Sequence, residues 1–129
     1  MTGPEPGATV PTMERYRLVP AGEGVQGRHP GEVPVAVKVL VGEDLTKHVR
    51  VKLTSTPVGV PKGGGHKHER CEHVAYIVSG QARIFLDDDP PFLLRSGDTL
   101  YISPGVFHDV VPVGDEPLVT LMVDVPPED

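Results

Sequence analysis

Hydrophobic and polar positions alternate in short runs along this chain, which is the pattern of β-strands. In the segment 48–56, HVRVKLTST, valine and leucine alternate with charged and polar residues, so one face of the strand is apolar and the other polar. The polar face, which carries His48, Arg50 and Lys52, either lines an internal cavity or meets solvent, and both interpretations stay open. No segment shows sustained apolar spacing of three and four residues, so we expect no helix longer than a turn or two.

The same reasoning predicts strands along the rest of the chain. Candidates lie at 16–20, 33–42, 74–80, 82–87, on both sides of the turn Ser96-Gly97-Asp98, at 107–113 and at 118–125. The segments 74–80 and 82–87 follow each other across Gly80-Gln81, as the arms of a hairpin would. About seven to nine short strands with frequent turn signals predict an all-β sandwich or barrel.

Length and composition indicate one domain. The chain has 129 residues, with 15 glycines and 15 prolines, which suits a single fold of short strands and turns. Residues 1–12 are rich in Pro and Gly and lack periodicity, so we expect a flexible tail, disordered or loosely draped, followed by one domain over 13–129.

Charge and cysteine content exclude several classes of partner. A formal net charge of -6 without a basic stripe argues against nucleic acid, whose phosphates the surface would repel. No run approaches the ~20 apolar residues of a membrane helix, and Cys71, the single cysteine, cannot form an intramolecular disulfide. We expect a cytoplasmic protein that binds neither nucleic acid nor membrane.

Histidines crowd into one stretch. GGGHKHERCEHVAYIVSGQARI, residues 63–84, holds three of the six histidines within eight positions. On an extended segment, His66 and His68 point to the same side, and a chain that doubles back over the turn ERCE returns His73 to the same place. His108 starts a later strand after the turn Pro104-Gly105. The four imidazoles predict a transition-metal site.

The two histidine segments resemble the two motifs of the cupin family. The first motif is glycine, His-x-His, a short spacer, glutamate, six residues and glycine; the second is glycine, five residues, Pro-x-Gly, two residues and histidine. This chain offers His66-Lys67-His68 and Gly80, then Gly97, Gly105 and His108, in matching register. The resemblance covers about 58–112 and implies a small single-domain cupin, a double-stranded β-helix or jelly-roll barrel.

The chain departs from the motifs at three points. Val60 stands where the first motif opens with glycine, Ser103 stands where the second has its proline, and His73 occupies the glutamate position, with Glu72 one place earlier. Neighbouring strand residues point to opposite faces, so Glu72 and His73 are alternatives, and the motif register counted from Tyr76 favours His73. The resemblance then implies one divalent metal per chain (Fe, Mn, Zn, Ni or Cu) on His66, His68, His73 and His108, whose neutral ligands leave it the full 2+ charge.

The resemblance implies a mononuclear metal-dependent enzyme acting on a small oxygen-rich molecule, most plainly a dioxygenase with an all-histidine site. A Lewis-acid isomerase, cyclase or dehydratase of a polyketide or sugar-type pathway is the second interpretation, and a non-catalytic metal-bearing binding or regulatory module is the third. Tyr76, Glu72 and Arg83 are catalytic candidates. Tyr76 could instead serve only in packing, and Arg83 could instead be an ordinary surface residue. Cys71 is either a ligand, a reactive thiol or an inert turn residue. Cupins commonly pair through N-terminal strands, so we expect a homodimer, with 33–42 apolar enough for the contact.

Overall fold

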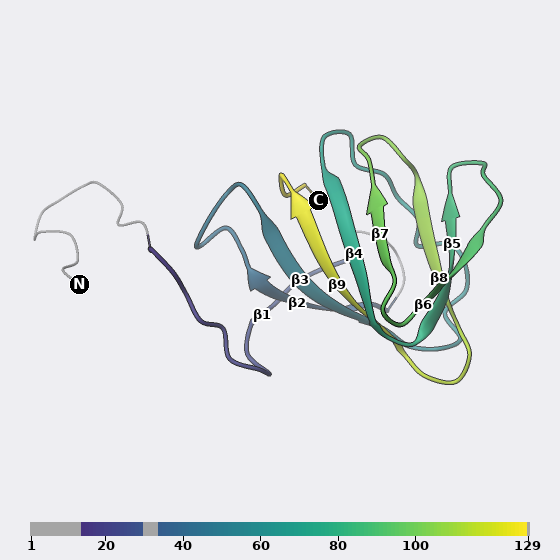
Figure 1. Ribbon diagram of the computed structural model, residues 1–129, viewed down its shortest axis with the longest axis horizontal. Coiled ribbons are helices and arrows are strands. Elements are labelled where there is room, and N and C mark those ends of the chain that lie inside the picture. The colour runs from purple at the N-terminus through teal and green to yellow at the C-terminus, as the bar shows by residue number, and fades with distance from the viewer. Residues whose placement is uncertain (1–13, 30–33, 129) are drawn as a thin grey trace, which may run out of the picture.

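The computed structural model describes residues 14–29 and 34–128 (Figure 1), so the predicted tail over 1–12 lies outside the described residues. These residues form nine strands and no helix, hence no helix that could cross a membrane. The all-β prediction is confirmed. The strands are β1 (Val25–Gln26), β2 (Ala36–Val41), β3 (Arg50–Thr56), β4 (Glu72–Ser79), β5 (Gln81–Leu86), β6 (Phe92–Arg95), β7 (Thr99–Ile102), β8 (His108–Val113) and β9 (Leu118–Val125).

The strands form two antiparallel sheets around one interior. The larger sheet has the order β1-β2-β3-β9-β4-β7, and the smaller has the order β6-β5-β8. Figure 1 shows the larger sheet fanning from β1 to β7, with β5, β6 and β8 at its β7 side. Strands adjacent in sequence alternate between the sheets at β4–β5, β6–β7 and β8–β9, which is how a jelly-roll barrel distributes its strands.

The predicted hairpin across Gly80 is wrong. β4 pairs with β9 and β7, whereas β5 pairs with β6 and β8, so the two strands lie in different sheets. A single residue is too short for a hairpin loop, which needs at least two. Gly80 has φ 84°, and a Cβ there would lie 2.4 Å from the carbonyl oxygen of Pro117. The chain therefore crosses between sheets at the one residue type that fits both constraints.

Other strand predictions hold with one exception. The candidate at 16–20 forms no strand, and the chain instead contributes β1, which pairs with β2. The turn after β6 is confirmed, because the backbone N–H of Arg95 donates to Asp98 Oδ2 at 2.7 Å. That bond caps the turn and directs the chain from β6 into β7.

The interior has an apolar end and a histidine end, and β4 runs between them. Its inward side chains are His73, Ala75 and Ile77, while Val74 and Tyr76 point outward. At the apolar end, buried residues from both sheets pack together: Ile77, Ala82, Ile84, Leu94 and Leu118. Burial of the Ile and Leu side chains contributes roughly 1.5–3 kcal/mol each, so this end stabilises the barrel and holds the other end in place.

Candidate metal centre

The histidine end begins where the loop after β3 meets β8. The backbones of His66 and His108 exchange two hydrogen bonds, with N···O distances of 3.0 and 2.9 Å. Residues paired in this way project their side chains to the same face, and the two ring centroids lie 4.6 Å apart. The loop approaches β8 closely at Gly65, where a Cβ would lie 2.4 Å from the ring of Phe107. Any larger residue here would force Phe107 and Asp109 to shift, so glycine eases the approach that brings His66 beside His108.

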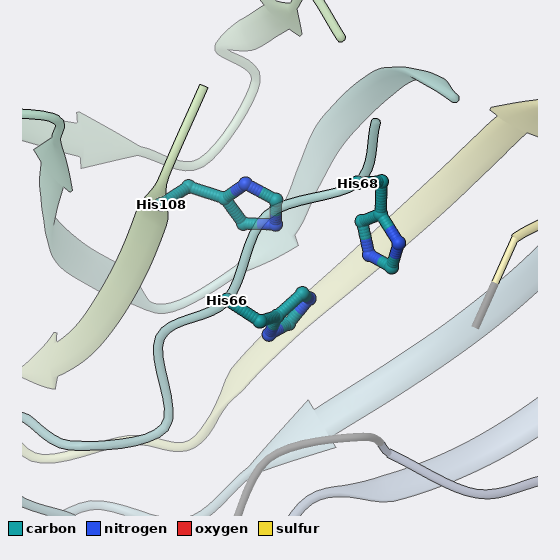
Figure 2. A group of neighbouring side chains, drawn as sticks. All are labelled: His66, His68 and His108. Atoms are coloured by element: carbon teal, nitrogen blue, oxygen red, sulfur yellow. The ribbon is translucent and has the colours of Figure 1, made fainter. Parts of the chain in front are cut away.

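His68 completes a group of three rings (Figure 2). Its carbonyl accepts a hydrogen bond from Gly105 N at 2.7 Å, which joins the loop to the turn before β8. Its ring centroid lies 4.8 Å from that of His66 and 5.9 Å from that of His108. One nitrogen from each of these three rings lies within 4.8 Å of the others. The nitrogen ligands of a tetrahedral zinc ion, each ~2.0–2.1 Å from it, lie about 3.3 Å from one another, so binding of one ion would draw these three nitrogens closer together.

The free nitrogens of these rings face inward. His66 Nδ1 lies 3.2 Å from the carbonyl of Gly64, and His108 Nδ1 lies 3.2 Å from that of Val106. A ring nitrogen facing a carbonyl carries the proton, so Nε2 of both rings keeps its lone pair. His68 Nδ1 is buried and has no hydrogen-bond partner among the described residues. An unsatisfied buried polar atom costs about 1–3 kcal/mol, and coordination to a metal would satisfy it.

His73 approaches the same space from β4. Its Nδ1 donates to Asp124 Oδ1 at 2.7 Å, while its Nε2 is buried without a partner among the described residues. Its ring centroid lies 4.6 Å from that of His68 and 5.2 Å from that of His108. A carboxylate holding one nitrogen while the other faces a cavity is the usual arrangement around metal-ligating histidines. The residues therefore fit a transition metal, with three close rings and a fourth beside them.

Asp124 belongs to a row of side chains that crosses the larger sheet. It lies on β9, opposite Arg50 of β3 on one side and His73 of β4 on the other. It is fully buried, and its Oδ2 lies 3.1 Å from Arg50 Nε and 3.3 Å from Lys52 Nζ. Burial would raise the pKa of Asp124, but the hydrogen bond from His73 and the charges of Lys52 and Arg50 lower it to about 2. Arg50 and Lys52 thus point inward, whereas His48 is exposed and lies before β3, so the polar face lines the interior only from Arg50 onward.

The three close histidines are neutral. Burial lowers the pKa of His66, and it lowers the pKa values of His68 and His108 to about 4. Neutral imidazole is the form that binds metals, so near neutral pH no proton competes for these nitrogens. His66, His73 and His108 border a cavity of about 100 Å³, which also receives Lys52 and Thr54 from β3 and extends to the apolar end.

The predicted catalytic residues lie elsewhere. Tyr76 points outward with 44% of its surface exposed, and Glu72 is exposed and accepts a hydrogen bond from Tyr101 Oη at 2.7 Å. Arg83 is exposed on the outer side of β5. Tyr76 is three residues from His73, and an odd separation in a strand places side chains on opposite faces. That spacing could have been read from the sequence. The structure brings none of the three to the histidines.

Cys71 and His29 complete the surroundings of the site. Cys71 is buried, burial raises the pKa of its thiol to about 11, and its Sγ donates to the carbonyl of Glu72 at 3.4 Å. Atoms of Cys71, His73 and Asp124 also lie within 4.8 Å of one another, but the carboxylate is committed to His73 and two cations, so we read this group as structural. His29, absent from the predicted site, stacks edge-on against His66 with centroids 5.3 Å apart. No sequence motif marks it.

The fold and the histidine cluster define a cupin-like protein, and the comparisons with known proteins agree. The model of the cupin domain matches residues 52–124, and the chain belongs to this family. It is 33% identical over 93 residues to the uncharacterized protein MJ1618 of Methanocaldococcus jannaschii, an alignment covering 70% of this chain and 73% of that protein.

Solved structures show the same fold. A predicted oxalate decarboxylase from Thermotoga maritima superposes with a TM-score of 0.73 at 21% identity, over 86% of this chain and all of that one (100%). KdgF from Halomonas sp. superposes with a TM-score of 0.64 at 21% identity, over 81% of this chain and 88% of that one. At such identity the likeness concerns the barrel alone.

Proposed function

We propose that this protein is a mononuclear metal-dependent enzyme whose centre is held by His66, His68 and His108, with His73 as a fourth ligand. The observation that carries the proposal is the pair of buried ring nitrogens, His68 Nδ1 and His73 Nε2, that lack partners among the described residues. A folded interior seldom leaves such atoms unsatisfied without a functional reason. The two rings are neighbours, with centroids 4.6 Å apart, and the His73 centroid lies 5.2 Å from that of His108, so we take one cation among these rings to satisfy both nitrogens.

At such a centre, different residues of the chain would orient the metal ligands and line the substrate site. A bound transition metal supplies Lewis acidity or one-electron chemistry at its open coordination positions. Asp124 fixes the tautomer and direction of His73 through the 2.7 Å hydrogen bond, and the backbone pairing of His66 with His108 fixes those two rings. The apolar walls exclude water from the substrate.

Dioxygenation of a small oxygen-rich substrate is the reaction that we propose first. It is supported by a ligand set of imidazoles without a carboxylate, since Glu72 points away from the cluster. A Lewis-acid isomerase, cyclase or dehydratase is the second candidate. It is supported by Lys52 and His29, which line the cavity beside the rings and are residue types that can move a proton.

Metal analysis of protein purified without chelators tests the proposal. We expect about one transition-metal ion per chain, and iron together with consumption of O2 in the presence of enolate or catecholate substrates would support dioxygenation. Redox-inactive zinc without O2 consumption would favour the second candidate. If the protein binds metal but converts no substrate of any class tested, the result would favour the non-catalytic binding module. Absence of metal binding would overturn the proposal.

We also propose that the protein works in the cytoplasm. Its single buried thiol suits a reducing compartment of this kind.

We place the homodimer contact on the outer face of the larger sheet rather than on β2, because β2 already pairs with β1 and β3 of its own chain. This face exposes large apolar side chains, which in monomers are rarely gathered: Val74, Tyr76, Val78, Tyr101 and Val125. Light scattering after size exclusion should give twice the mass of the chain.

A further inference from the structure

We propose that the ligand of this centre is a small carboxylate anion, admitted and held by a basic mouth formed by Arg28, His29, Arg50 and Lys52. The inference deepens the proposed function and rests on it, because the anion is taken to occupy the cavity beside the metal. It names a substrate class that neither the fold nor the histidine cluster specifies.

The mouth is a second cavity beside β2 and β3. Its volume is about 440 Å³, within the ~300–1,000 Å³ range of small-molecule sites, and its lining is the four basic residues together with Gly27, Val37 and Val39. Among the described residues that line it, none is acidic. The whole chain has a net charge of -6, so this concentration of positive groups runs against the overall charge. A cleft of one sign focuses field lines and raises the local concentration of the opposite ion.

Lys52 connects the mouth to the metal centre. Its side chain is 13% exposed and lines both cavities, as does His29. Its ammonium lies 3.3 Å from Asp124 Oδ2, and an ammonium has three donors. It can therefore hold Asp124 and donate to a second carboxylate at the same time.

The charge balance of the inner cavity favours an anion. Two carboxylates line or border it, Asp124 and Asp109. Asp124 is held by its basic partners, and Asp109 accepts a hydrogen bond from Gly63 N at 3.0 Å. Arg50 and Lys52 offset these two charges. A divalent metal on neutral imidazoles then adds two positive charges that no side chain in this group compensates, so an incoming anion restores neutrality in a poorly solvated space.

The size of the inner cavity limits the body of the ligand. At about 100 Å³ it holds roughly what a few water molecules occupy, at ~30 Å³ each. Its deeper walls are apolar, with Ile77, Ile84 and Leu118 at the far end. A short carbon chain with one carboxylate suits this combination, with the charged head at Lys52 and the apolar part toward the barrel core.

Propionate and its neutral isostere propionamide are the probes for the test. Zinc is first titrated into ¹⁵N-labelled protein while the amide and imidazole signals are followed by NMR, and failure of zinc to bind overturns the proposed function itself. With zinc bound, propionate and then propionamide are titrated. We expect propionate to bind about tenfold more tightly, as a hydrogen bond to a charged group permits, and to shift the amide signals of the mouth. Equal affinities would overturn this inference and leave the metal centre standing.

Substitutions test whether the preference for propionate over propionamide comes from the mouth. Lys52→Met should weaken propionate about tenfold and leave propionamide within about twofold. Lys38→Met is the matched control, because Lys38 lies on the neighbouring β2 opposite Leu53 and lines neither cavity. Arg28→Met keeps the test open if Lys52→Met fails to fold: it should weaken propionate about threefold at ~20 mM salt and not at ~500 mM. Arg83→Met, on the far side of the barrel, should change neither. Undiminished propionate binding in both mouth variants refutes the role of the mouth.

Discussion

The two ends of the barrel interior are equally buried but differ in how their atoms are satisfied. At the apolar end, Ile77 and Ile84 are 1% and 0% exposed, and packing against neighbours is all that they need. At the histidine end, His68 and His73 are 5% and 3% exposed, yet each keeps a ring nitrogen without a partner among the described residues. The apolar end needs no ligand to satisfy its atoms. At the histidine end, the unsatisfied nitrogens cost free energy that a bound ligand would recover, which is typical of a functional site.

Among the substitutions, His68→Ala should show the largest difference between its effect on zinc affinity and its effect on stability. Zinc bound by four protein ligands gains about 10–16 kcal/mol in all, or about 2.5–4 kcal/mol per ligand, so loss of one ligand should weaken zinc roughly 100- to 1,000-fold. The metal-free protein should lose little stability, because the variant also removes an unsatisfied nitrogen worth about 1–3 kcal/mol. Competition with a chromophoric chelator measures the affinity, and urea unfolding measures the stability. Lys67→Ala, at the exposed position between the ligands, is the control. Wild-type zinc affinity in His68→Ala would remove our ligand set.

Ile77→Ala tests the apolar end in the opposite sense. Truncating a fully buried Ile typically costs about 2–5 kcal/mol in the free energy of unfolding, and urea titration of metal-free protein should show it. Zinc affinity of the folded variant should stay within about twofold, since distant sites act independently. Val58→Ala, in the turn after β3 with 42% exposure, should cost less than about 1 kcal/mol. A large loss of zinc affinity in Ile77→Ala would mean that the two ends are coupled.

The sequence predicts the barrel and the four histidines because both depend on local signals. Alternation marks the strands, glycine and proline mark the turns, and the motif spacing places His66, His68 and His108. The inward direction of His73 also follows from local parity, since it shares a face with Ala75 and Ile77. The same alternation places Tyr76 and Glu72 on the opposite face of the strand from His73, so the sequence alone was enough to exclude them from the site.

What the sequence does not predict depends on pairing between distant segments. Asp124 is 51 residues from His73, and only the order β3-β9-β4 makes them neighbours. Its charge at the end of the apolar strand 118–125 was the available hint. The hairpin error at Gly80 has the same origin, because two adjacent strands can pair with each other or with partners elsewhere, and local pattern does not choose.

Asp124→Asn tests whether Asp124, on β9, holds His73 in the tautomer that can bind metal through Nε2. Removing a carboxylate that holds a ligand typically weakens metal binding about 10–100-fold. ¹⁵N NMR of the imidazoles should also show that His73 no longer keeps its proton on Nδ1, a change that a purely structural defect would not produce. Asp109→Asn is the matched control: it too removes a buried carboxylate beside the site, but one that accepts from Gly63 N rather than from an imidazole. An unchanged His73 tautomer in Asp124→Asn would contradict the positioning role.

The smallest effects should come from the outer face of the strand that joins the two ends. Tyr76→Phe and Glu72→Gln change side chains that point away from the interior, so each should alter zinc affinity by less than about twofold and unfolding free energy by no more than about 0.5 kcal/mol. Glu72→Gln retains an acceptor for the hydroxyl of Tyr101. Chelator competition and urea titration serve again. A tenfold loss of zinc affinity in Glu72→Gln would show that the carboxylate reaches the metal, and the division of β4 into a ligand face and an outer face would then be wrong.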